Sequence, residues 1–463
     1  MRHSLSCLAA VAILAACASA PTDFSYTVPD QPEGASGFTQ KPGWVTNRFA
    51  VAAANPLATD AGYQILKAGG SAIDAAIAVQ MVLALAEPQS SGIGGGAFLL
   101  HFNGKDVEAF DGRETAPMAA TEKLFIKADG KPMAFDEGMA GGRAVGVPGT
   151  VRMLELAHQQ HGKLPWAVLF QPTIALAEGG FKVSSRLHML LKADPFLKLD
   201  PVAAAYFYNA DGSPHAVGHV LKNPALAAVL RKLATLGSKG LHEGEVAQAI
   251  VDKVQRHPGN PGQLSMADLA SYQAKKRDPL CHDYTAQGVG ASGSRSYRIC
   301  GFPPPSSGAI AVGQILGMLQ HTNAATLPLE NGQPGAEWLN LYTEAARMAF
   351  ADRGQYVADP DFVQPRAAAG RANTYLASRA SLIGPQSMKT AKPGTPGAVK
   401  TSYAPMLEQP EYGTSHISIV DAYGNALAMT TTIEAAFGAR HMVKSFLLEP
   451  KQSVPRNVIS SVI

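Results

Sequence analysis

The segment Gly413-Thr414-Ser415-His416, in which a threonine follows a glycine, contains residue types suited to acyl-transfer chemistry. A threonine hydroxyl is a weak nucleophile and needs a base to remove its proton. If the bond between Gly413 and Thr414 is cut, Thr414 gains a free α-amine with a pKa near ~8, so one residue supplies both nucleophile and base. Gly413 has no side chain to obstruct the N-to-O acyl shift that starts such a cleavage. The tetrapeptide also fits the start of an ordinary β-strand, so alone it leaves both interpretations open.

Two other patterns are better explained by structure than by chemistry. The segment from Gly92 to Ala97 has the spacing G-x-G-x-x-A, but a dinucleotide-binding fingerprint follows a strand and opens a helix. Here a predicted helix precedes the glycines and a predicted strand follows, so we interpret them as a tight turn. His158 and His161 are three residues apart on a predicted helix, without a carboxylate or cysteine partner pattern nearby. We therefore expect a solvated helix end and no metal site.

The elements that must position Thr414 form a predicted hairpin. Residues 416–420 alternate between apolar and polar, 421–425 form a turn, and 426–433 return as a second strand. A helix over 72–86, opened by Ser71 or Asp74, is apolar nearly all round and must be buried. Mixed strands and long helices predict an α+β or layered α/β fold. Further strands are expected at 47–54, 98–102, 107–111 and 297–300, and further helices at 61–67 (capped by Thr59), 150–161, 164–178, 225–236, 244–255, 309–319 and 336–351.

Several short segments form an ordered set between about residue 45 and residue 448. They are 54–58 (ANPLA), 69–76 (GGSAIDAA), 87–96 (EPQSSGIGGG), 113–117 (RETAP), 147–149 (VPG), 304–308 (PPSSG), 351–353 (ADR), 359–361 (DPD) and 413–416 (GTSH). Each is weak alone, but together and in this order they resemble the γ-glutamyltranspeptidase (γ-glutamyltransferase, glutathione hydrolase) family. The resemblance implies an α+β fold, the N-terminal-nucleophile hydrolase αββα sandwich, in which helices cover two stacked sheets.

The resemblance also implies roles for individual residues. Thr414 is the nucleophile, and Gly413–Thr414 is the bond that the protein cleaves in itself. Thr432 matches the threonine on the neighbouring strand that orients the nucleophile, although Thr430 and Thr431 suit a strand equally well. Arg113 matches the arginine that binds the substrate α-carboxylate, for which a planar guanidinium is well suited. Glu434 matches the position that holds the substrate α-ammonium.

The implied reaction is transfer of a γ-glutamyl group from glutathione or a similar amide, through a γ-glutamyl-Thr414 intermediate, to water, an amino acid or a peptide. It implies no metal or organic cofactor, and the two segments made by self-cleavage stay associated. One alternative is a cephalosporin or glutaryl acylase of the same fold. A second is a non-catalytic lipoprotein remnant. The chain has 39 basic and 36 acidic residues and no long basic run, so nothing in its composition predicts binding to nucleic acid.

The first residues are typical of an export signal. An apolar stretch after Arg2 is too short to span a bilayer and ends in Leu14-Ala15-Ala16-Cys17, which resembles a lipobox. We expect a signal at 1–17, a lipidated Cys17, and a periplasmic protein anchored to the bacterial outer membrane. The alternative is ordinary cleavage after Ala18-Ser19-Ala20. The expected divisions are a tether at 18–45, a large-subunit region at 46–413 and a small-subunit region at 414–463.

Two cysteines remain beyond this leader. Cys281 and Cys300 flank a Gly/Ser-rich segment, and a disulfide between them is plausible in an oxidising periplasm. Sequence spacing does not reveal the Cα geometry, so two unpaired thiols remain the alternative.

The resemblance fails after Leu448. The chain continues as Glu449-Pro450-Lys451-Gln452-Ser453, where the family pattern has paired asparagines and an acidic residue. The family segment that follows carries an aspartate for the substrate amine, a serine pair and the glycine pair of the oxyanion hole. Loss of an oxyanion donor typically costs about 10²–10³ in turnover. We therefore expect a C-terminally truncated small subunit, and a chain that is inactive or barely active on γ-glutamyl-p-nitroanilide.

Overall fold

The computed structural model describes residues 45–287, 293–362, 372–397, 413–443 and 446–448. The expected signal at 1–17 with Cys17, nearly all of the expected tether at 18–45, and the segment from Glu449 onward lie outside the described residues.

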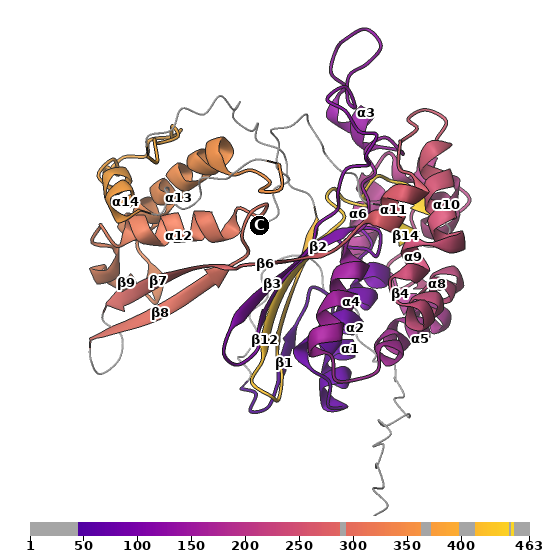
Figure 1. Ribbon diagram of the computed structural model, residues 1–463, viewed down its shortest axis with the longest axis horizontal. Coiled ribbons are helices and arrows are strands. Elements are labelled where there is room, and N and C mark those ends of the chain that lie inside the picture. The colour runs from indigo at the N-terminus through magenta and orange to yellow at the C-terminus, as the bar shows by residue number, and fades with distance from the viewer. Residues whose placement is uncertain (1–44, 288–292, 363–371, 398–412, 444–445, 449–463) are drawn as a thin grey trace, which may run out of the picture.

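A six-stranded antiparallel sheet forms the centre of the molecule (Figure 1). Its order is β1 (Ala50–Ala52), β11 (Thr414–Val420), β12 (Ala426–Thr432), β2 (Gly96–Phe102), β3 (Val107–Gly112) and β6 (Lys275–Arg277). The predicted hairpin is thus present as β11 and β12. It lies between β1 and β2, so two strands from the end of the chain complete a sheet begun near its start.

Helices cover one face of this sheet (Figure 1). They are α1 (Pro56–Lys67), α2 (Ala72–Ala86) and α4 (Thr150–His161). Every residue of α2 is buried, as its apolar composition predicted, and Ser71 and Asp74 form a capping box at its start. The cap expected at Thr59 is wrong: Asn55 caps α1, its Oδ1 accepting from Leu57 N at 3.0 Å, because Pro56 already fits the first helical turn.

A second set of helices packs outside α2 and α4. The glycine segment at 92–96 joins the end of α2 to β2, in the helix-then-strand order that argued against a dinucleotide site. The remaining elements of this part are α3 (Phe135–Met139), η1 (Trp166–Phe170), α5 (Gln171–Gly179), β4 (Phe181–Lys182), α6 (Ser185–Ala193), η2 (Leu197–Leu199), α7 (Pro201–Phe207), β5 (Val220–Leu221), α8 (Pro224–Leu236), α9 (Lys239–His242), α10 (Gly244–Gln255), α11 (Met266–Ser271), β13 (Met442–Val443) and β14 (Phe446–Leu447).

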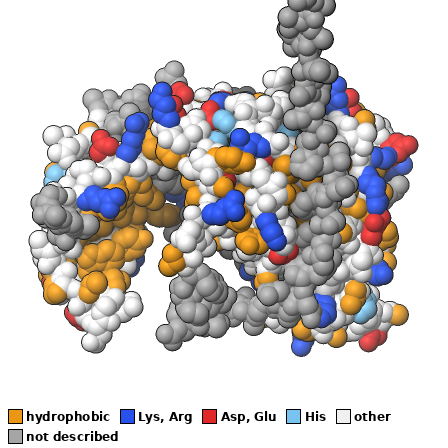
Figure 2. All heavy atoms as spheres, turned by 90° about the horizontal axis from the view of Figure 1, so that it is seen from below, with side chains coloured by type: hydrophobic (Ala, Val, Ile, Leu, Met, Phe, Trp, Pro, Cys, Tyr) orange, Lys and Arg blue, Asp and Glu red, His pale blue; other side chains and the backbone are white. Residues whose placement is uncertain are grey.

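A lobe that follows β6 stands to one side of the sheet (Figure 1). It has its own apolar cluster, centred on Met318, Ala345 and Met348. Its elements are β7 (Leu280–Gln287), β8 (Ser294–Gly301), α12 (Gly308–Leu319), η3 (Ala324–Thr326), β9 (Leu329–Glu330), β10 (Gln333–Pro334), α13 (Ala336–Tyr356) and α14 (Asn373–Ala380). Figure 2 shows apolar side chains gathered on the side of this lobe that faces the main body, where the molecule is hollowed.

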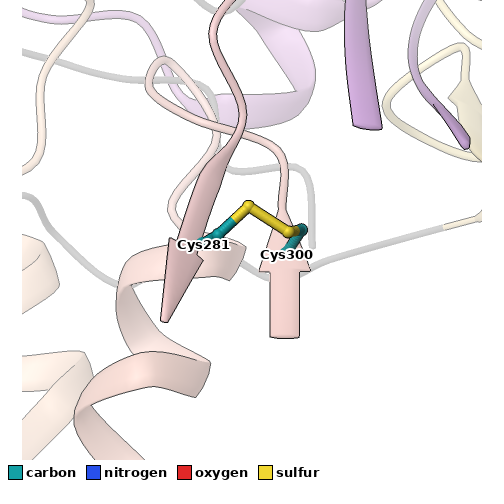
Figure 3. Close-up of a disulfide and its surroundings, with 2 residues drawn as sticks. All are labelled: Cys281 and Cys300. Atoms are coloured by element: carbon teal, nitrogen blue, oxygen red, sulfur yellow. A yellow bond between two sulfur atoms is a disulfide. The ribbon is translucent and has the colours of Figure 1, made fainter. Parts of the chain in front are cut away.

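The hairpin of β7 and β8 brings the two cysteines together. Cys281 pairs directly with Cys300 in the antiparallel register, with Cα atoms 4.0 Å apart, and a disulfide joins their sulfurs (Figure 3). The disulfide therefore ties β7 to β8.

The two faces of β11 differ in burial. Ser415, Ile417 and Ile419 point into the helix-covered core, while Thr414 and His416 lie on the opposite, more exposed face. Among the described residues, no helix combines the length and apolar character needed to cross a bilayer.

Candidate active site

The residues predicted to do chemistry meet at one end of the central sheet. β11 begins at Thr414 and β12 ends at Thr432, and these two residues pair directly. Thr432 also pairs with Gly96, the first residue of β2, and the next residue, Ala97, pairs with Gly112 at the end of β3. Arg113 follows at once. Antiparallel pairing therefore places residues about 300 positions apart in the sequence at the same end of the sheet.

The Thr432 hydroxyl connects the expected nucleophile to the bond before it. Thr414 Oγ1 donates to Thr432 Oγ1 at 3.4 Å, and Thr432 Oγ1 donates to the carbonyl oxygen of Gly413 at 3.3 Å. The backbone N–H of Glu434 donates to the same hydroxyl at 2.8 Å. A hydroxyl has one proton to donate and two lone pairs, so Thr432 Oγ1 is fully used. Thr432 is 2% exposed, and its χ1 is fixed by these three contacts.

Gly413 adopts a backbone conformation that disfavours other residues. Its φ is +68°, in the left-handed region where a side chain is strained. A Cβ added there would lie 2.8 Å from the carbonyl oxygen of Gln89, closer than real Cβ contacts come. That carbonyl accepts from Phe437 N at 3.3 Å, so it is held in place. The structure thus gives a second reason for glycine at 413, beside an unobstructed acyl shift.

Arg113 lies between two carboxylates. Its Nη2 is 2.9 Å from Glu434 Oε2, and its Nε is 2.9 Å from Glu114 Oε1. The side chains of Arg113 and Glu114 are 5% and 0% exposed, whereas that of Glu434 is 18% exposed. The Tyr272 hydroxyl donates to the Arg113 carbonyl at 2.8 Å, and Asp111 Oδ1 accepts from the Arg113 N–H at 2.9 Å. Both ends of the arginine are therefore fixed, and its guanidinium faces the end of β12.

A histidine occupies the next position along the face that carries Thr414. His416 Nδ1 lies 2.9 Å from Thr430 Oγ1, the cross-strand neighbour of His416. Burial lowers the pKa of His416, so its ring is neutral near pH 7. A neutral imidazole adds no charge beside the α-amine that cleavage would create on Thr414.

The sequence patterns did not predict several residues that surround the site at this end of the sheet. The Gln89 carbonyl excludes a side chain at 413, and Glu114 and Tyr272 hold Arg113 in place, but the sequence patterns predicted no role for these three residues. Glu114 lies in the segment 113–117 and Gln89 in the segment 87–96, so the ordered set of segments could have indicated both residues. Tyr272, which directly follows α11, lies in none of these segments, so no sequence pattern indicated its role.

Both histidines set aside as a helix end lie near a carboxylate in the folded chain. His158 Nε2 lies 2.9 Å from the carbonyl of Leu164, at the surface of α4. His158 Nε2 also lies 3.5 Å from Asp74 Oδ1, and His161 Nε2 lies 2.6 Å from Glu108 Oε2. The sequence pattern offered no carboxylate partner because Asp74 and Glu108 stand 84 and 53 residues before His158 and His161.

Comparison with known proteins agrees with this geometry. The family model of γ-glutamyltranspeptidase matches residues 58–450. A glutathione hydrolase proenzyme from Bacillus subtilis is 35% identical over 405 residues, which are 86% of this chain and 66% of that protein. The crystal structure of Helicobacter pylori γ-glutamyltranspeptidase superposes with a TM-score of 0.69 at 30% identity, over 78% of this chain and 100% of that chain. A cephalosporin acylase from Bacillus halodurans gives 0.74 at 26% identity, over 91% and 73%.

These likenesses confirm the predicted fold class, an α+β fold of the N-terminal-nucleophile hydrolase type. The chain spans just under two thirds of the length of the curated relatives that it matches. The match of the family model over most of the chain and the identity to glutathione hydrolase proenzymes place it in the γ-glutamyltranspeptidase family.

Proposed function

We propose that this protein cleaves its own chain between Gly413 and Thr414 and then catalyses γ-glutamyl transfer or hydrolysis with Thr414 as the nucleophile. The observation that carries the proposal is the position of the Thr432 hydroxyl. It accepts from Thr414 Oγ1 and donates to the carbonyl oxygen of Gly413, so it contacts both partners of the first reaction.

The proposed cleavage is an N-to-O acyl shift. Thr414 Oγ1 attacks the carbonyl carbon of Gly413; a C–O bond forms, the C–N bond breaks, and the proton moves to the nitrogen of Thr414. The negative charge that develops on the Gly413 oxygen is stabilised by the donor of Thr432. Water then hydrolyses the ester, which leaves a carboxylate on Gly413 and a free α-amine on Thr414. That amine is the base for later turnovers.

The charges next to Thr414 suit an amino-acid-like acyl group. A γ-glutamyl group carries an α-carboxylate and an α-ammonium, and Arg113 and Glu434 carry the opposite charges 2.9 Å apart. We propose that the substrate replaces this ion pair by two, its carboxylate on Arg113 and its ammonium on Glu434. Glu114, fully buried against Arg113 Nε, keeps the guanidinium in place during the exchange. The exposure of Glu434 gives it room to move.

A substrate comparison tests this proposal against the acylase alternative. Hydrolysis of γ-glutamyl-p-nitroanilide and of glutaryl-p-nitroanilide is measured with the same protein, with Thr414→Ala as the control without a nucleophile. A glutaryl group has the carboxylate but lacks the ammonium. We expect a preference for the γ-glutamyl substrate that Glu434→Ala removes. Faster release from the glutaryl substrate would favour the acylase function instead, and equal release by Thr414→Ala would contradict both.

The leader at residues 1–17 bears on where the protein is located in the cell. We propose an exported protein, held at the outer membrane of a bacterium by a lipid on Cys17, with glutathione or a related γ-glutamyl compound as its substrate. The ordered leader pattern at 1–17 supports export.

A further inference from the structure

Three side chains with metal-binding atoms converge on the helix-covered face of the central sheet. His101 on β2 pairs directly with Glu108 on β3, so their side chains point to the same face. His161 is the last residue of α4, the helix that packs on these two strands. One ligand atom from each residue lies within 4.8 Å of the other two.

Glu108 uses its two oxygens for different partners. Oε2 lies 2.6 Å from His161 Nε2 and 3.6 Å from His101 Nδ1, between two imidazole rings whose centroids are 4.3 Å apart. Oε1 accepts from the Lys276 ammonium, which also donates to Gln160 Oε1 at 2.9 Å. The lysine therefore fixes the carboxylate through one oxygen and leaves the other facing both histidines, as a hydrogen-bonded carboxylate does at a metal.

His101 is the residue that a purely structural role does not explain. It is 1% exposed; its Nδ1 has only the 3.6 Å contact with Glu108 Oε2, and its Nε2 has no hydrogen-bond partner among the described residues. Its neighbours on this face, Leu99 and Phe110, are buried and apolar. A buried polar group without a partner is costly, and an aliphatic side chain would fill the same position without that cost.

We propose that His101, Glu108 and His161 bind a divalent transition-metal ion of the Zn²⁺ type, with water in the open position. Two imidazoles and one carboxylate form a ligand set that such ions prefer. With bonds of about 2.0–2.1 Å, tetrahedral ligand atoms lie about 3.4 Å apart. The contact of His101 with Glu108 already fits this spacing. The contact of His161 with Glu108 must open by about 0.8 Å, which a side chain at a helix end can provide.

The proposed ion lies apart from the acyl-transfer site. His101 is five residues along β2 from Gly96, about 17 Å at the usual rise per residue, and points to the opposite face from Thr414. The ion would therefore link the end of α4 to the β2–β3 hairpin and stabilise the fold. Glu108 and His161, at 17% and 20% side-chain exposure, give it a route from solvent.

Metal binding is tested on untagged full-length chain that has been stripped with a chelator. Equilibrium dialysis against Zn²⁺ measures stoichiometry and affinity, and Co²⁺ gives visible absorption bands as a second readout. We expect one ion per chain, and an affinity lower by at least about 10-fold in Glu108→Gln and in His161→Asn. The matched control is His158→Asn, one turn earlier on the same helix, which should bind as the wild type does.

A thermal melt separates a metal site from a simple ion pair between His161 and Glu108. For a metal site, Zn²⁺ raises the melting temperature of the wild type and of His158→Asn but not that of Glu108→Gln. For an ion pair alone, Glu108→Gln lowers the melting temperature and Zn²⁺ changes nothing, which would overturn the proposal. Binding of equal affinity in Glu108→Gln and His161→Asn would overturn it as well. Circular dichroism confirms that each variant is folded, and none of these measurements depends on cleavage at Thr414.

Discussion

Replacing Thr432 with valine should slow self-cleavage strongly while leaving the fold in place. Valine has nearly the shape of threonine but no hydroxyl, so the packing at the end of β12 is kept. Three contacts are lost: the donor to the Gly413 carbonyl, the acceptor for Thr414 Oγ1 and the acceptor for the Glu434 N–H.

The size of the effect follows from the first of these contacts. Removing one donor to a developing oxyanion costs about 10²–10³ in rate. The contact to the Gly413 oxygen is 3.3 Å, longer than the usual O–H···O distance of about 2.7–2.8 Å, so the low end applies. We expect cleavage slower by about 100-fold, which corresponds to about 2.7 kcal/mol in the activation free energy.

The assay is a time course of the two fragments on a denaturing gel, with the new N-terminus sequenced as Thr-Ser-His. Thr432→Ser keeps the hydroxyl and should cleave within a few-fold of the wild-type rate. Thr430→Val removes a hydroxyl from the same strand and face, one that contacts His416, and should not slow cleavage. The reasoning is refuted if Thr432→Val cleaves at the wild-type rate, or if Thr430→Val slows cleavage equally.

Three further outcomes are expected. Arg113→Lys should raise KM for γ-glutamyl-p-nitroanilide by about 10-fold or more with a smaller change in kcat, because one ammonium cannot hold two carboxylates as a guanidinium does; an unchanged KM would exclude Arg113 from substrate binding. Asp200→Ala should lower the unfolding free energy by about 3 kcal/mol near pH 7, since Asp200 both caps α7 and pairs with Lys253 and His441. Burial acts to raise the pKa of Asp200, but the hydrogen bonds from His441 and Lys253 outweigh it and hold the pKa well below its usual range. The stabilisation is therefore complete above about pH 4 and is lost in stronger acid, so denaturant titrations should show the difference between wild type and variant shrinking there; a difference constant with pH would contradict this. Cys17→Ser should move the protein from the membrane pellet to the soluble periplasmic fraction, and a variant that stays in the pellet would argue against the lipid.

Much of the fold could be predicted because local signals were strong. The helices at 150–161 and 244–255 begin and end at the expected residues, since their apolar period is clear and Gly or Pro bounds them. The cap of the first helix was misplaced because Thr59 and Asn55 are both good capping residues, and only the proline at the first helical position favours Asn55. The polar strand β7 was missed because it lies half exposed in a lobe and lacks an apolar run.

Local patterns alone predict the site only as far as the hairpin; Arg113 and Glu434 were predicted through the family resemblance. Thr414 and Thr432 face each other because they are ends of one hairpin, and a hairpin is visible in sequence. Arg113 and Glu434 are 321 positions apart, and the order of the strands in the sheet shows how they come into direct contact. His161 and Glu108 were overlooked for the same reason, because helix periodicity says nothing about the strand beneath.

The insertion of the β11–β12 hairpin between β1 and β2 fixes an order of events. Both outer neighbours of the hairpin come from the chain before Gly413, so the part that starts at Thr414 is threaded into a frame made by the other part. A separately made fragment would have to open a finished sheet to enter it. If the chain is cut at 413, as we propose, this topology predicts that folding precedes the cut. After the proposed cut, the two segments would stay joined through the β1–β11 and β12–β2 strand pairs, and Thr414 would carry a new free amine.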